Sequence, residues 1–66
     1  MAPVTEITFA GGERYRVEGD AKEVEALIVD ASRGSIMQLA WLRDTDTGEP
    51  IGVNPEQIVM LRSLAS

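Results

Sequence analysis

The stretch VTEITFAGGERYRVE, residues 4–18, decides the first half of the fold, because two alternating segments flank a glycine pair. Alternation with a period of two is typical of strands that are buried on one face. A three-residue loop with Gly12 in the left-handed conformation places Ile7 opposite Tyr15, whereas a two-residue turn would mix the faces. The stretch therefore predicts a β-hairpin with Tyr15 and Val17 on its apolar side.

The next segment predicts a helix over residues 21–33. Asp20 is a good N-cap, and Glu23 stands three residues on, as in a capping box. Gly34 provides a C-terminal stop. Val29 lies about 140° around the helix from the apolar stripe, which makes it a candidate contact residue. The stripe comprises Val24, Leu27, Ile28 and Ala31.

Residues 35–43 predict the longest strand, and both of its faces are apolar. Met37, Leu39 and Trp41 occupy one face. A strand that is apolar on both faces is normally covered on both, and one helix cannot cover both sides of a small sheet. We therefore expect the other face to bind another subunit, a protein partner or a ligand. The candidate interface residues are Ile36, Gln38, Ala40, Leu42, Gly52 and Val29.

The turn cluster at 44–48 predicts a second hairpin. A five-residue loop pairs Trp41 with Ile51, and it places Gly52 opposite Ala40. Gly52 would leave a shallow patch that another backbone or a ring could approach closely. A pocket for a small molecule over Ala40 and Gly52 is a further possibility.

Residues 54–57, Asn-Pro-Glu-Gln, fit either a tight turn or a helix start. The all-round apolar run at 58–61 favours a turn followed by a short strand, with residues 63–66 as a frayed end. We thus predict one α+β domain over residues 1–66, in the order ββαββ, with a loose start at 1–3.

Composition narrows the function classes. The 66-residue chain contains no Cys and no His, so disulfides, thiol catalysis and the commonest metal ligand are excluded. The Asp44–Glu49 loop does not fit the EF-hand spacing of glycine and glutamate. No nucleotide-binding glycine motif is present. We predict a non-enzymatic protein without a cofactor or metal.

The net charge of −5 argues against nucleic acid as the principal partner. Arg14 and Arg16 nevertheless share the outward face of the second predicted strand. Cross-strand pairing with neighbouring glutamates is the simpler explanation for them. An arginine-bearing surface of an oligomer that binds nucleic acid is the alternative.

Residues 51–61 combine a strand, an Asn-Pro turn and a second strand, and this unit resembles small bacterial proteins such as the flagellar FlbD family. The segment from Phe9 to Glu23 and Val24 is similar to the other half of that family, although the halves are reversed in order. Together they cover about half of the chain. The resemblance implies a compact, sheet-rich bacterial accessory protein, and it implies no site residues.

Taken together, these observations predict a small acidic accessory module. We expect it to form a homo-oligomer or to bind a protein partner through an apolar sheet face. A polar start without a signal-like segment, and the lack of a long apolar run, predict a cytoplasmic protein that does not enter the membrane.

Overall fold

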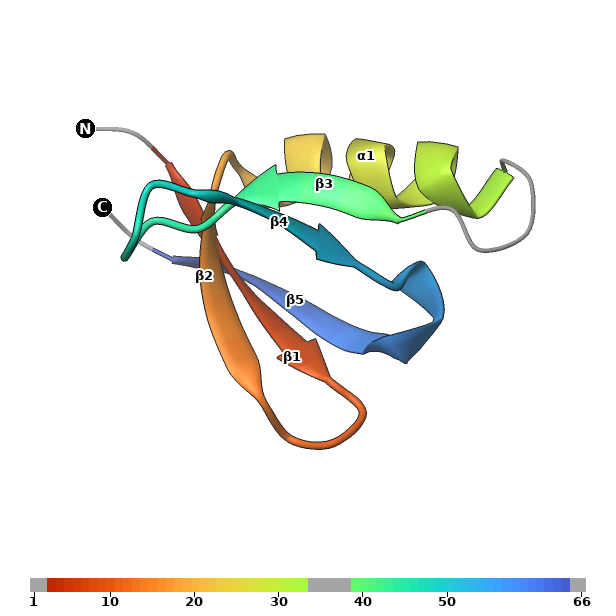
Figure 1. Cartoon of the computed structure of the whole chain (residues 1–66). Helices are drawn as coiled ribbons and strands as arrows, with labels where there is room; N and C mark the ends of the chain where they lie inside the picture. Colours follow the sequence, from red (N-terminus) through yellow and green to blue (C-terminus); the bar gives the residue numbers. More distant parts are fainter. Residues whose placement is uncertain (1–2, 34–38, 65–66) are drawn as a thin grey trace.

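A computed structural model describes residues 3–33 and 39–64 of the chain (Figure 1). The described residues confirm a mixed α+β fold in the predicted order ββαββ, formed by two small antiparallel sheets and a helix. A single 3₁₀ turn, Pro55–Gln57, precedes the last strand. The other elements are β1 (Val4–Phe9), β2 (Arg14–Glu18), α1 (Ala21–Arg33), β3 (Ala40–Arg43), β4 (Pro50–Val53) and β5 (Ile58–Leu64).

The first hairpin has the predicted register. Ile7 pairs with Tyr15 and Gly12 has a φ of 92°, as the three-residue loop requires. Ile7 and Val17 are fully buried in the core. The burial predicted for Tyr15 is wrong. Its side chain is 42% exposed near the hairpin tip, where neither α1 nor the second hairpin covers it fully.

Helix α1 has the predicted bounds. The backbone N–H of Glu23 donates to the Asp20 carboxylate over 2.8 Å, which confirms Asp20 as the N-cap. Val24 and Ala31 of the apolar stripe are buried. Leu27 is 48% exposed, so the buried stripe is narrower than its spacing indicated. Gly34 lies outside the described residues.

The second hairpin is shifted by one residue from the predicted register. Trp41 pairs with Gly52, and Leu42 pairs with Ile51. The Asp44 N–H donates to the Glu49 carbonyl over 2.9 Å, so the loop is one residue shorter than expected, covering 45–48. A shift of one residue exchanges the faces of a strand relative to its partner.

Strand β5 begins after the Asn54 turn and pairs with β1. The Asn54 side chain accepts a hydrogen bond from the Glu56 N–H, which caps the 3₁₀ turn. A β-bulge between Thr8 and Phe9 interrupts the pairing of β1 with β5. Strand β5 continues to Leu64 and is the longest strand described, so it is neither short nor frayed from residue 63.

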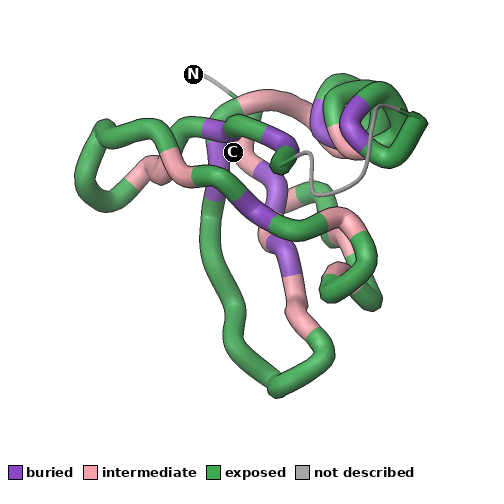
Figure 2. The backbone as a smooth tube through the Cα atoms, turned by 45° about the vertical axis from the view of Figure 1, so that its right-hand side comes forward, coloured by how far each residue is buried: buried purple, intermediate pink, exposed green. Residues whose placement is uncertain are grey.

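Backbone pairing joins the two sheets near Val17 of β2. The Thr45 N–H donates to the Arg16 carbonyl over 3.0 Å, beside a bridge between Val17 and Asp44. The strands thus follow each other in the order β5-β1-β2-β3-β4, with a bend at the bridge (Figure 1). The small core lies between the sheets and α1 (Figure 2). Its buried apolar residues are Ile7, Val17, Val24, Ala31, Ala40, Leu42 and Val53.

Candidate functional site

The two faces of β3 have opposite environments. Ala40 and Leu42 point into the core and are 2% and 4% exposed. Leu39 and Trp41 lie on the other face and are 40% and 62% exposed. Strand β3 therefore buries one apolar face and leaves the second uncovered within the chain.

Gly52 allows the Trp41 ring to approach the neighbouring strand closely. A Cβ atom at Gly52 would lie 3.1 Å from Cη2 of Trp41 and 3.0 Å from Cδ1 of Leu39. The Leu39 and Trp41 side chains therefore pack against the Gly52 backbone. They lie so close to it that the Cβ atom of any other residue at position 52 would be crowded. A large aromatic side chain commonly shields a strand glycine in this way.

Leu27 of α1 extends this apolar area. Leu27 and Trp41 line one shallow hollow, together with Pro3. We call Leu27, Leu39, Trp41 and Gly52 the Trp41 surface. Monomeric proteins rarely expose a contiguous set of large apolar side chains without a binding role.

Charges of both signs surround the Trp41 surface. Glu18, Glu23 and Arg43 all line the same hollow. The Arg43 guanidinium also donates to the Gly48 carbonyl over 2.5 Å, which holds it beside the surface. An apolar centre with a polar rim is the usual organisation of a protein–protein interface.

The structure buries two residues of the predicted interface. Ala40 and Leu42 cannot contact a partner because α1 and the first hairpin cover them. Gly52 is exposed, but on the Trp41 side. Val29 is 38% exposed on the far side of α1, and Ile36 and Gln38 lie outside the described residues. An apolar pattern on both faces of a strand does not indicate which face the helix covers.

Sequence reasoning missed Trp41, Leu39 and Leu27 as surface residues. Their apolar character placed them in the predicted core. The available signal was the pairing of a tryptophan with a glycine, which a four-residue loop would have produced.

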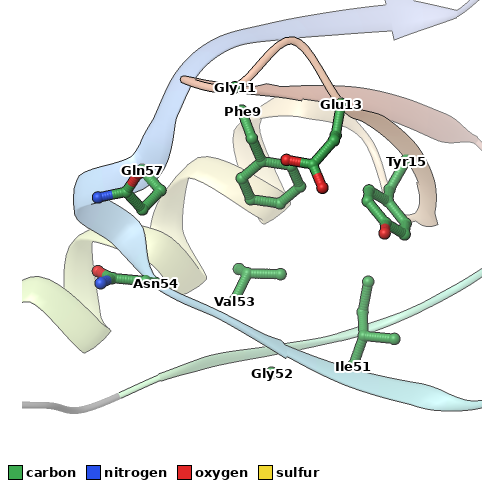
Figure 3. A pocket seen from close by; sticks show the side chains of 9 residues that line it. All are labelled: Phe9, Gly11, Glu13, Tyr15, Ile51, Gly52, Val53, Asn54 and Gln57. Atoms are coloured by element: carbon green, nitrogen blue, oxygen red, sulfur yellow. The ribbon is translucent and has the colours of Figure 1, made fainter.

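A second hollow separates the tip of the first hairpin from β4 (Figure 3). Its volume is about 530 Å³, and the Phe9 and Tyr15 rings form one wall in an edge-to-face contact with centroids 5.6 Å apart. Ile51 and Val53 form the opposite wall. Gly52 lines this hollow, whereas the buried Ala40 does not.

The outward face of the first sheet brings arginines together around one glutamate. Glu6 of β1 pairs with Arg16 on β2 and with Arg62 on β5. Arg14 pairs with Thr8, one step along the same face. The structure therefore adds Arg62 to the predicted pair Arg14 and Arg16.

Residues 3–33 and 39–64 contain no group of three or more acidic, His or Cys side chains that could hold a metal ion. In the same residues, no helix has the length and apolar character needed to cross a membrane.

Comparison with known proteins yields no match to a protein-family model, a curated protein or a solved structure. The resemblance to the FlbD family stays a prediction.

Proposed function

We propose that the protein is a non-enzymatic interaction module that associates with a second copy of itself through the Trp41 surface. The observation that carries this proposal is the 62% exposure of Trp41 beside two further exposed leucines. A cytoplasmic location and a role as a bacterial accessory protein stay part of this proposal, on the sequence evidence alone.

The small core supports association. Two of its seven buried apolar residues are alanines, and none is aromatic. Domains of this size bury a small fraction of their surface and commonly gain stability from a partner subunit. Covering the exposed part of a tryptophan contributes about 2–4 kcal/mol per copy, from about 25 cal/mol per Å² of apolar area.

The rim charges favour a second copy as the partner. In a two-fold contact, residue i of one protomer meets residue j of the other, and the reverse pair forms as well. Arg43 at the rim of the Trp41 surface can therefore face Glu18 or Glu23 of the other copy, twice per dimer. A surface with one sign of charge would not complement itself.

Two substitutions on α1 form a matched test. Leu27 belongs to the Trp41 surface, whereas Val29 lies about 200° around the helix from it. Both side chains are exposed, so neither substitution removes a core contact. In sedimentation equilibrium, Leu27→Lys should weaken association at least about tenfold, because it places a charge in an apolar contact. Val29→Lys should retain wild-type association, and equal association constants for the two variants would reject the proposal.

Nucleic-acid binding is the second candidate function, and the alignment of Arg14, Arg16 and Arg62 on one sheet face favours it. Binding through phosphates should weaken steeply with salt. A gel-shift titration with single-stranded oligonucleotides tests this candidate. Loss of binding in Arg14→Ala/Arg16→Ala, with retention in the Arg33→Ala control on α1, would support it. Absence of any shift at low salt would exclude it.

A further inference from the structure

The hollow between the first hairpin and β4 is lined by side chains that point into it from two sides. Figure 3 shows Phe9, Glu13 and Tyr15 pointing from the first hairpin toward Ile51 and Val53 of β4. The volume of about 530 Å³ lies within the range of sites that hold small molecules. Apolar walls with a small number of polar groups are the usual composition of such sites.

Backbone hydrogen bonds hold the rim of this hollow in place. The Phe9 N–H donates to the Glu13 carbonyl over 2.9 Å, which closes the hairpin tip. The Ala10 N–H donates to the Gln57 carbonyl over 2.7 Å, and the Gln57 N–H donates to the Asn54 carbonyl over 3.0 Å. The tip is thus tied to the 3₁₀ turn after β4, so a ligand would meet a preformed site and would order little of the chain on binding.

The two aromatic rings form a corner of the hollow. The Phe9 and Tyr15 rings meet at 78° with centroids 5.6 Å apart, so their faces stand nearly at right angles. The Tyr15 side chain is accessible from outside, with 42% of its surface exposed. Aromatic faces are electronegative and attract a cation that lies within about 6 Å of the ring centroid. Ring faces at right angles are suited to surround an ammonium group.

Glu13 gives the hollow a negative charge. Among the lining residues that the structure describes, it is the only one with a charged side chain. A Cβ atom at Gly11 would lie 3.1 Å from Oε1 of Glu13, so the carboxylate lies close to the Gly11 backbone, on the wall that carries the rings. A cation in the hollow would be attracted to this carboxylate, whereas an anion would be repelled by it.

We propose that this hollow binds an organic cation. Its ammonium group contacts the Phe9 and Tyr15 rings and the Glu13 carboxylate. Its apolar part extends along Ile51 and Val53, which form the opposite wall.

This site goes beyond the proposed function, because β4 separates it from the Trp41 surface. A Cβ atom at Gly52 would point to Trp41, whereas the side chains of Ile51 and Val53 point into the hollow. Side chains alternate between the two faces of a strand. Loss of association through the Trp41 surface should therefore leave the binding of a cation unchanged, and the two proposals fail separately.

The first test measures what the positive charge contributes to binding. Choline and its neutral isostere, in which carbon replaces the ammonium nitrogen, have the same shape and are compared in nuclear magnetic resonance titrations. Choline should shift the backbone amide signals of Gly11, Glu13 and Gly52. The neutral isostere should bind at least about fivefold more weakly, because the rings and the carboxylate do not attract it. Equal dissociation constants, or no shift of these signals with choline, would overturn the proposal.

The second test uses variants of matched charge. Glu13→Gln keeps the size of the side chain and should weaken the binding of choline about threefold or more. Glu25→Gln, at an exposed position of α1, changes the net charge equally and should retain wild-type affinity. Tyr15→Leu should reduce the preference for choline over its isostere, and circular dichroism melting confirms that each variant is folded. Equal affinities of Glu13→Gln and Glu25→Gln, or an unchanged preference in Tyr15→Leu, would contradict the proposed contacts.

The ammonium group can belong to a free small molecule or to a lysine side chain of another protein. Titration with the capped amino acid N-acetyl-trimethyllysine amide distinguishes these sources, because it carries the same cation on a lysine stem. Tighter binding of this probe than of choline supports a lysine side chain, and tighter binding of choline supports a free small molecule. Failure of both probes to bind would overturn the proposal.

Discussion

The two hairpins are both antiparallel pairs, yet they use their apolar residues differently. The first hairpin buries Ile7 and Val17 and leaves polar side chains outward. The second buries Ala40 and Leu42 but leaves Trp41 on its outer face. The first hairpin therefore has one apolar face, in the core, whereas the second has one apolar face in the core and another that is exposed. The exposed tryptophan is therefore the main difference between the two hairpins.

The largest expected effect on stability is the difference between a substitution in the core and one on the exposed face of β3. Ile7→Ala should lower the free energy of unfolding by about 2–5 kcal/mol, because it leaves a cavity in a small core. Trp41→Ala should lower the stability of the monomer by about 1 kcal/mol or less, since surface substitutions usually cost little. Urea unfolding of each variant at low protein concentration measures both. A larger loss for Trp41→Ala than for Ile7→Ala would show that the ring belongs to the core.

An intermediate effect is expected at the loop of the first hairpin. Gly12 has a φ of 92°, and a side chain there would meet no atom within 4 Å. Gly12→Ala should therefore cost about 1–2 kcal/mol through backbone strain alone. Gly11→Ala, at the neighbouring position, is the comparison, and its cost in thermal melting should be smaller. Equal losses would mean that the loop changes its conformation to accept the substitution.

The smallest effect on stability is expected at Gly52. A methyl group there would meet the Trp41 ring, which is exposed and can move aside. Gly52→Ala should cost about 1 kcal/mol or less, in the range of surface substitutions, and it should change the near-ultraviolet circular dichroism of the tryptophan. It should also weaken association, because it alters the shape of the Trp41 surface. An unchanged spectrum would contradict the contact between Trp41 and Gly52.

The same two hairpins show how far sequence reasoning extends. The glycine pair after Ala10 limits the first loop to a few lengths, and the alternating faces of the two strands then determine one register. The turn cluster from Asp44 to Gly48 accepts a loop of four or five residues, and both produce an apolar strand face. No residue in or beside the loop distinguishes these two loop lengths, because the choice depends on how β3 packs against α1 and Val17.

The other predictions also divide into features that local sequence determines and features that tertiary packing determines. The bounds of α1 follow from Asp20 and its apolar spacing, and the turn at Asn54 follows from its side chain and the proline after it. The pairing of β5 with β1 joins segments that are distant in sequence, and no local pattern specifies it. The choice of the exposed face of β3 is also a tertiary property, which explains why Trp41 was predicted on the core side and Ala40 and Leu42 on the open side.

Trp41 is the single tryptophan of the chain, so its fluorescence reports directly on the Trp41 surface. The decisive measurement is its emission maximum as a function of protein concentration, in the wild type, Leu27→Lys and Val29→Lys. Burial of the ring in a dimer predicts a shift to shorter wavelength with rising concentration in the wild type and Val29→Lys, and a much weaker shift in Leu27→Lys. An emission maximum that stays at the solvent-exposed value in all three proteins at every concentration would contradict association through Trp41.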